Sequence, residues 1–255
     1  QHTPTRRQRQ MCIRDSYQMT NKSIKVITFD LDDTFWDITP VIIRAEVETR
    51  KWIEQQLDSD IKWGNLEEFI NLRKRLIAEN HSLEYDLSAL RKASLKYHVH
   101  KFFKNKIDLD NFVNEAFGIF FNYRQQVKLF AGVKRFLKKM SAEIDLGVLT
   151  NGNADIKLIG IDKFFKCSIS SKDVCSNKPD PKHFEEAARF FNVNINQILH
   201  IGDDPINDVR GAIDAGAHAI WFNKKGLAWN EKMSKPVVID DWKKGYVQIK
   251  ENYEF

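Results

Sequence analysis

The chain has 255 residues, which is enough for one α/β core and a smaller added unit. Its composition, 42% hydrophobic and 29% charged, is that of a globular protein. No apolar run approaches the ~18 residues that a membrane span needs, so we expect no membrane partner. The net charge of +5 falls to +2 without residues 1–18, which leaves 36 basic and 34 acidic residues. The remaining chain is therefore not basic enough to suggest a nucleic-acid partner.

Residues 1–18 carry four arginines and one acid, and residues 11–16 (MCIRDS) look like a translated transposon end from sequencing-library preparation. We expect a disordered or non-native leader, with the natural protein beginning at Met19. A nucleic-acid or membrane tether is the alternative, and only the arginines favour it. The cysteines Cys12, Cys167 and Cys175 lack paired metal-ligand spacing, which fits a reducing cytoplasm.

Six short apolar runs predict β-strands, and helical patterns separate most of them. The runs are 24–29, 144–149, 167–170, 198–201, 218–222 and 236–240, and the clearest helices are 132–140, 181–191 and 207–215. Strands that alternate with helices indicate a doubly wound parallel sheet with both faces covered.

The first two strands are separated by a long insertion without strand patterns. Phenylalanines recur at helical spacing in residues 110–124, and residues 87–98 form a weaker stripe of the same kind. We expect about four helices packed as a bundle over residues 40–127. Residues 19–39 and 128–255 then form the α/β core.

Polar residues follow four of the expected strands. They are Asp30 and Asp32, then Thr150, Asn151 and Gly152, then Lys178 with Pro179, and finally Gly202, Asp203 and Asp204 with Asp208. The carboxyl ends of parallel strands line the crevice where open α/β sheets bind ligands. Burying several carboxylates there is costly unless a cation or catalysis requires them. We therefore expect these groups to meet in one pocket.

In order and content, these four motifs resemble the haloacid dehalogenase superfamily, in its phosphatase branch, and the resemblance extends from about Lys25 onward. It implies a Rossmann-like core with the insertion as a helical cap. It also implies that Asp30 is the nucleophile that forms an aspartyl-phosphate. Asp32 would then be the general acid and later the base.

The resemblance further implies Mg²⁺ bound by Asp30, the backbone carbonyl of Asp32 and Asp203. Asp208 would orient a bound water or Lys178 from outside this shell, while Asp204 either assists or caps the next helix. Thr150, Asn151, Gly152 and Lys178 would bind the phosphate. The backbone N–H groups would do so where a helix start favours anions.

Among superfamily branches, the chain is similar to bacterial phosphatases that act on flavin mononucleotide and on 5-amino-6-(5-phosphoribitylamino)uracil. This implies a small phosphorylated metabolite as the partner, in a monomer or homodimer. Trp36 or a cap aromatic would stack on a flat heterocycle, unless Trp36 packs the core–cap hinge near Thr39 and Lys128. The alternatives are a 2-haloacid dehalogenase, which leaves Asp32 and Asp203 unexplained, and a non-catalytic binding protein.

Overall fold

The computed structural model describes residues 23–255, so the expectations for residues 1–18 lie outside the described residues. It contains one six-stranded sheet in the order β3-β2-β1-β4-β5-β6, and every neighbouring pair is parallel. The strands are β1 (Val26–Phe29), β2 (Asp145–Thr150), β3 (Cys167–Ser170), β4 (Ile198–Gly202), β5 (His218–Phe222) and β6 (Val237–Ile239). The expected doubly wound parallel sheet is therefore confirmed.

Helices cover both faces of this sheet, and its central strands are therefore buried on both sides. On one face, α6 (Val133–Met140) and α11 (Trp242–Asn252) pack on an aromatic cluster that includes Phe29. On the other face lie α9 (Lys182–Phe191) and α10 (Gly211–Asp214). Short helices α7 (Ile156–Ile159) and α8 (Ser171–Val174) follow β2 and β3.

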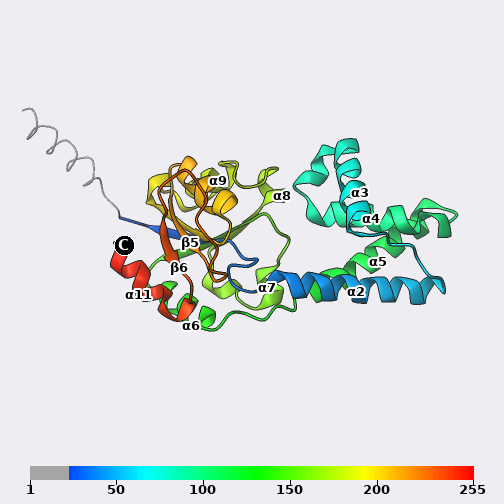
Figure 1. The fold of residues 1–255 in the computed structure, drawn as a ribbon, viewed down its shortest axis with the longest axis horizontal. Helices are drawn as coiled ribbons and strands as arrows, with labels where there is room; N and C mark the ends of the chain where they lie inside the picture. Colours follow the sequence, from blue (N-terminus) through cyan, green and yellow to red (C-terminus); the bar gives the residue numbers. More distant parts are fainter. Residues whose placement is uncertain (1–22) are drawn as a thin grey trace, which may run out of the picture.

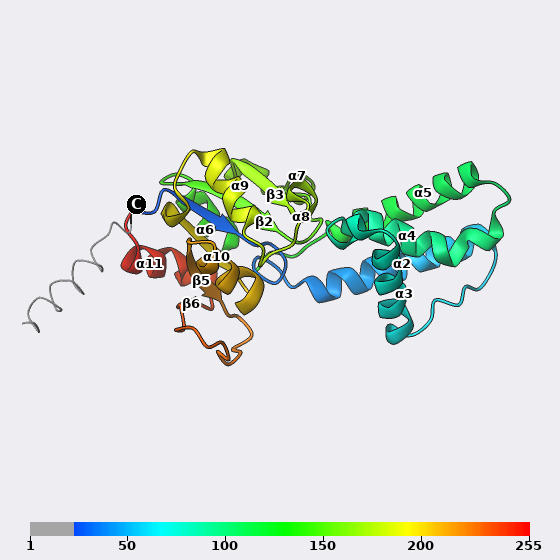
Figure 2. The same ribbon diagram turned by 90° about the horizontal axis from the view of Figure 1, so that it is seen from above.

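Four longer helices form a second lobe beside the core (Figure 1). They are α2 (Ile38–Leu57), α3 (Leu66–Glu79), α4 (Leu87–Val99) and α5 (Lys106–Arg124). The lobe has its own apolar cluster, which joins Ile53 of α2, Leu95 of α4 and Val113 of α5. Seen from above, α2 and α5 run out from the end of the core at which β1 terminates (Figure 2).

Two helical segments differ from the sequence expectations in ways that bear on the site. Helix α2 begins at Ile38, because the Asp37 side chain accepts a hydrogen bond from the N–H of Thr39 and caps the helix. Thr39 is therefore part of the helix rather than of a linker. The expected helix 207–215 is a π-helical segment, η5 (Pro205–Arg210), followed by α10.

Candidate active site

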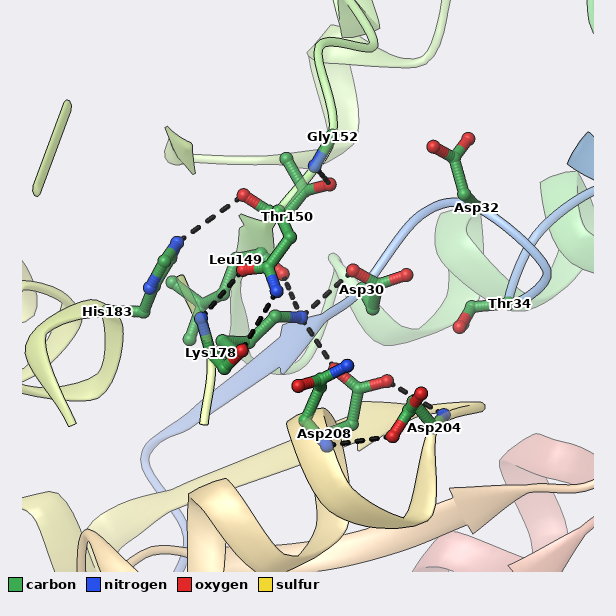
Figure 3. A network of polar contacts seen from close by, with 12 residues as sticks. Asp30, Asp32, Thr34, Leu149, Thr150, Gly152, Lys178, His183, Asp204 and Asp208 are labelled. Carbon is green, nitrogen blue, oxygen red and sulfur yellow. Dashed lines mark hydrogen bonds and ion pairs between the residues drawn. The ribbon is translucent and has the colours of Figure 1, made fainter. Parts of the chain in front are cut away.

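The side chains of Asp30 and Lys178 meet at the carboxyl end of β1 (Figure 3). Asp30 follows β1 directly, and Lys178 lies on the loop between α8 and α9. The Lys178 Nζ atom lies 2.9 Å from Asp30 Oδ1, 2.6 Å from Asp208 Oδ1 and 2.7 Å from the Leu149 carbonyl oxygen. All three donor positions of this buried ammonium are thus occupied.

Behind Lys178, a buried polar chain continues into the sheet. Asp208 lies 3.2 Å from His200 Nε2, and His200 Nδ1 lies 2.9 Å from the Thr28 hydroxyl. Burial lowers the pKa of His200 to about 4. Burial alone would raise the pKa of Asp208, but Lys178 and His200 lower it below its ordinary value. Asp208 is therefore a fixed carboxylate that orients Lys178.

Asp203 completes a group of three carboxylates. Oxygen atoms of Asp30, Asp203 and Asp208 all lie within 4.8 Å of one another. Burial raises the pKa of Asp203 to about 8 and that of Asp30 to about 7, and neighbouring carboxylates add to both effects. The Thr34 hydroxyl, 3.4 Å away, is a weak donor to Asp203.

The charges of this cluster fit a divalent cation. Three carboxylates face one ammonium, and His200 is neutral, so the fully ionised group carries a net charge of −2. Hard cations such as Mg²⁺ prefer carboxylate oxygens of this kind. Asp30 and Asp203 are the residues that would hold it, because the nearer oxygen of Asp208 is engaged by Lys178.

The loop after β2 is organised by side-chain hydrogen bonds. Asn151 Oδ1 accepts from the Lys178 N–H (2.7 Å), and Asn151 Nδ2 donates to the Lys178 carbonyl oxygen (3.0 Å), which fixes the lysine loop. The Gly152 N–H donates to Thr150 Oγ1 at 2.9 Å. The expected helix start at this loop is wrong, since α7 begins only at Ile156 after its cap, Asp155.

Asp204 and Gly202 shape the turn that presents Asp203. The Asp204 side chain accepts from the N–H groups of Ile206 and Asn207 at 2.8 Å each, so it caps η5. The Asp204 N–H in turn donates to Asp208 Oδ2 at 2.9 Å. A Cβ on Gly202 would lie only 2.2 Å from the Asp208 carboxyl carbon. The close approach of η5 to β4 therefore requires glycine.

The Asp32 carboxylate turns away from this cluster, as Figure 3 shows. Arg124 Nη2 lies 2.6 Å from Asp32 Oδ2, and Trp36 Nε1 donates to Asp32 Oδ1 at 2.8 Å. Trp36 is fully buried in the core, so the expectation that it stacks on a substrate is wrong, and the packing alternative holds. Bridges to Asp32 and Leu129 place Trp36 where the two core–cap connections meet.

Arg124 is a site residue that sequence reasoning missed. It ends α5, is 1% exposed, and donates through Nε to Asn153 Oδ1 at 3.0 Å. An arginine in the last turn of a helix is also favoured by the helix dipole, so its position alone carried no signal of a site. Asp32 and Arg124 are 92 residues apart in sequence.

Two pockets flank these groups. One, of about 250 Å³, lies beside Asp203 and is lined by Phe130, Phe222 and Lys225 among others. The other, of about 650 Å³, lies between the core and the helical lobe, where Gly152 and Asn153 face Ser88 and Phe121.

Comparisons with known proteins identify the family of the chain. The family of haloacid dehalogenase-like hydrolases matches residues 24–216. The chain is 29% identical to the 5-amino-6-(5-phospho-D-ribitylamino)uracil phosphatase YigB of Escherichia coli, over 78% of this chain and 83% of the relative. It is 30% identical to a glyceraldehyde 3-phosphate phosphatase of Pyrococcus abyssi, over 78% and 81% respectively.

Among solved structures, one described as a 2-haloacid dehalogenase from Pseudomonas syringae is 33% identical. It has a TM-score of 0.83 over 89% of this chain and 99% of that one. The family match spans the first four strands, the helical lobe and the acidic cluster. The chain therefore belongs to the haloacid dehalogenase-like hydrolases.

Proposed function

We propose that the protein is a Mg²⁺-dependent phosphatase that hydrolyses a small phosphomonoester through an aspartyl-phosphate on Asp30. The observation that carries this proposal is the meeting of Asp30, Lys178, Asp203 and Asp208 at the carboxyl edge of the sheet. Asp32 lies two residues after Asp30 in the same loop. A phosphate ester needs a positioned nucleophile, positive charge around its oxygens and a proton for its leaving group. This set of residues offers all three.

In the first step, an Asp30 oxygen attacks phosphorus and the bond to the ester oxygen breaks. Asp32 gives that oxygen its proton, the Lys178 ammonium supplies positive charge beside Asp30, and the loop from Thr150 to Gly152 lies against the phosphoryl oxygens. In the second step, water attacks phosphorus, Asp32 takes a proton from it, and the bond to Asp30 breaks. The bound cation would offset the negative charges of the carboxylates and the phosphoryl group.

For the substrate, we propose a riboflavin-pathway phosphate such as flavin mononucleotide or the phosphoribitylaminouracil. The relative YigB supports this class by its name, and the pocket between core and cap supports it by its lining. Phe121 offers an aromatic surface there, and Ser88 and Asn153 offer polar groups. The similar glyceraldehyde 3-phosphate phosphatase points instead to a smaller ester. Hydrolysis rates on a panel of phosphorylated metabolites distinguish these two substrate classes.

A 2-haloacid dehalogenase is the second candidate, because the similar structure from Pseudomonas syringae carries that description. Halide displacement needs neither a metal nor a proton for the leaving group. Purified protein incubated with para-nitrophenyl phosphate, with Mg²⁺ or with a chelator, separates the two. We expect nitrophenolate release that requires Mg²⁺ and is lost in Asp30→Asn. Halide release from a 2-haloacid without added metal would overturn the proposal.

A further inference from the structure

The contacts of Asp32 have a feature that the proposed reaction does not use. Each of its two carboxylate oxygens receives one donor, Arg124 Nη2 on Oδ2 and Trp36 Nε1 on Oδ1. Neither donor can accept a proton in return, because guanidinium and indole N–H groups are donors only. In this arrangement both oxygens of Asp32 accept hydrogen bonds, and the two donors fix the orientation of its carboxylate.

The neighbours of Arg124 determine where that carboxylate lies. Arg124 Nε is held by Asn153 of the loop after β2, and Asn153 Nδ2 donates to Ser88 of the helical lobe at 3.1 Å. A Cβ on Gly152 would lie 2.8 Å from Asp32 Oδ2, so the carboxylate lies directly against the phosphate-binding loop. Arg124 thus connects the loops after β1 and β2 at the edge where the phosphoryl group would bind.

Arg124 also has an unused donor. Its Nη1 is buried and has no hydrogen-bond partner among residues 23–255. A buried guanidinium N–H without an acceptor is costly, so residues that serve packing alone rarely keep one. The remaining N–H is available to an oxygen that enters the site with substrate or water.

We propose that Arg124 is a positioning residue for the second half-reaction, which rests on the proposed phosphatase activity. It holds Asp32 as the base that takes a proton from water when water attacks the aspartyl-phosphate. With a leaving group that departs without taking a proton, only this second step needs Asp32, so only this step depends on how Arg124 and Trp36 orient its carboxylate. Loss of Arg124 therefore slows release of phosphate from Asp30 more than formation of the phosphoryl enzyme.

Rapid mixing with para-nitrophenyl phosphate and Mg²⁺ tests this inference, because nitrophenolate leaves without a proton donor and reports the first step alone. For Arg124→Gln we expect a burst approaching one nitrophenolate per protein. A steady rate about 10-fold to 100-fold below wild type should follow, because general base catalysis contributes about 10²-fold to 10⁴-fold and Asp32 itself is kept. Arg124→Lys keeps the charge and should recover part of the steady rate.

Arg44→Gln is the matched control. Arg44 donates to the carbonyl oxygens of Tyr123 and Gln126 on both sides of Arg124, and among residues 23–255 it forms no hydrogen bond or ion pair with Asp32. Its burst and steady rate should match those of wild type. If Arg124→Gln does not fold, Trp36→Phe removes the other donor and should lower the steady rate alone, by a smaller factor.

Two results would overturn the inference while the proposed function stands. One is a steady rate in Arg124→Gln equal to that of wild type. The other is an equal loss of burst rate and steady rate, which would indicate a general structural role. If wild type itself releases no nitrophenolate with Mg²⁺, the proposed function fails, and the inference fails with it.

Discussion

Gly202 leaves the space that Asp208 occupies beneath the Asp30–Lys178 pair. A Cβ at this position would lie 2.6 Å or less from three atoms of the Asp208 side chain, and Asp208 cannot move without releasing Lys178. For Gly202→Ala we expect the free energy of unfolding to fall by about 1–3 kcal/mol, as for overpacked cores, together with most of the activity.

Gly118 in α5 provides the control for this change, since a Cβ there would meet no atom within 4 Å. Gly118→Ala should raise the free energy of unfolding by up to about 1 kcal/mol, because alanine is the better helix former. Chemical denaturation of both variants measures the difference. A Gly202→Ala protein as stable and active as wild type would contradict the role given to this glycine.

Asp203 is the least compensated carboxylate of the acidic cluster. Burial raises its pKa to about 8, so near neutral pH the metal-free protein must take up a proton at Asp203 when it folds, and this lowers its stability. Asp203→Asn should therefore make the metal-free protein more stable, by about 1–3 kcal/mol. The same change should abolish the rise in melting temperature that Mg²⁺ gives wild type, because a cation that binds only the folded state stabilises it.

Thermal unfolding with Mg²⁺ and with a chelator gives both quantities. These two effects distinguish the loss of a metal ligand from general damage, since a damaged variant would be less stable than wild type both with Mg²⁺ and with the chelator. A less stable metal-free variant, or Mg²⁺-dependent stabilisation that persists in Asp203→Asn, would contradict the assignment of Asp203 as a metal ligand.

Helix α9 carries a buried histidine into the space below the end of β2. His183 is fully buried, and its Nε2 lies 3.4 Å from the Thr150 carbonyl oxygen. Burial, with a smaller effect of Lys178, lowers the pKa of His183 to about 4, against about 6.5 for an unfolded chain. The folded state thus binds fewer protons between these values, so its stability falls as pH decreases from 6.5 to 4.

The measurement is denaturant unfolding of wild type and His183→Gln at several pH values in this window. Wild type should lose roughly 1.4 kcal/mol per pH unit more than the variant, because one proton is linked to unfolding. Equal slopes would mean that His183 is not held neutral by the fold.

The elements of the core were predictable because their patterns are simple. Strands β1 and β4 are short, mostly apolar runs that end at polar motifs, and this pattern identified both the strands and the edge that they share. The π-helical form of η5 was not predictable, because it depends on the Asp204 cap and on the approach of Asp208 to Gly202. Helix α2 begins two residues earlier than expected, because the Asp37 side chain caps it.

At the scale of the whole molecule, the candidate site is a convergence of distant segments. It was predictable that four segments would be neighbours, because parallel strands place their carboxyl ends together. These segments are the motifs after β1, β2 and β4 and the loop that carries Lys178. The contact between Asp32 and Arg124 was not, because it depends on how α5 returns to the core after the whole helical lobe. Sequence patterns carry little information about such single contacts between lobes.

Two further polar contacts join the two lobes. Asn177 donates to the Glu84 carbonyl oxygen at 3.1 Å, and Lys172 lies 3.0 Å from Asp86. Exposed pairs of this kind contribute little to stability. They are compatible with a lobe that opens to admit substrate and closes to exclude water.

The central claim is that Asp30 becomes covalently phosphorylated. Acid quenching of Asp32→Asn during turnover of a phosphomonoester with Mg²⁺, followed by peptide mass analysis, tests it most directly, because loss of Asp32 slows hydrolysis of the intermediate. We predict a phosphoryl group on the peptide that contains Asp30, absent in an Asp30→Asn, Asp32→Asn double variant and absent without metal. Phosphate release by wild type with a phosphoryl group on another residue, or with none trapped, would contradict the account.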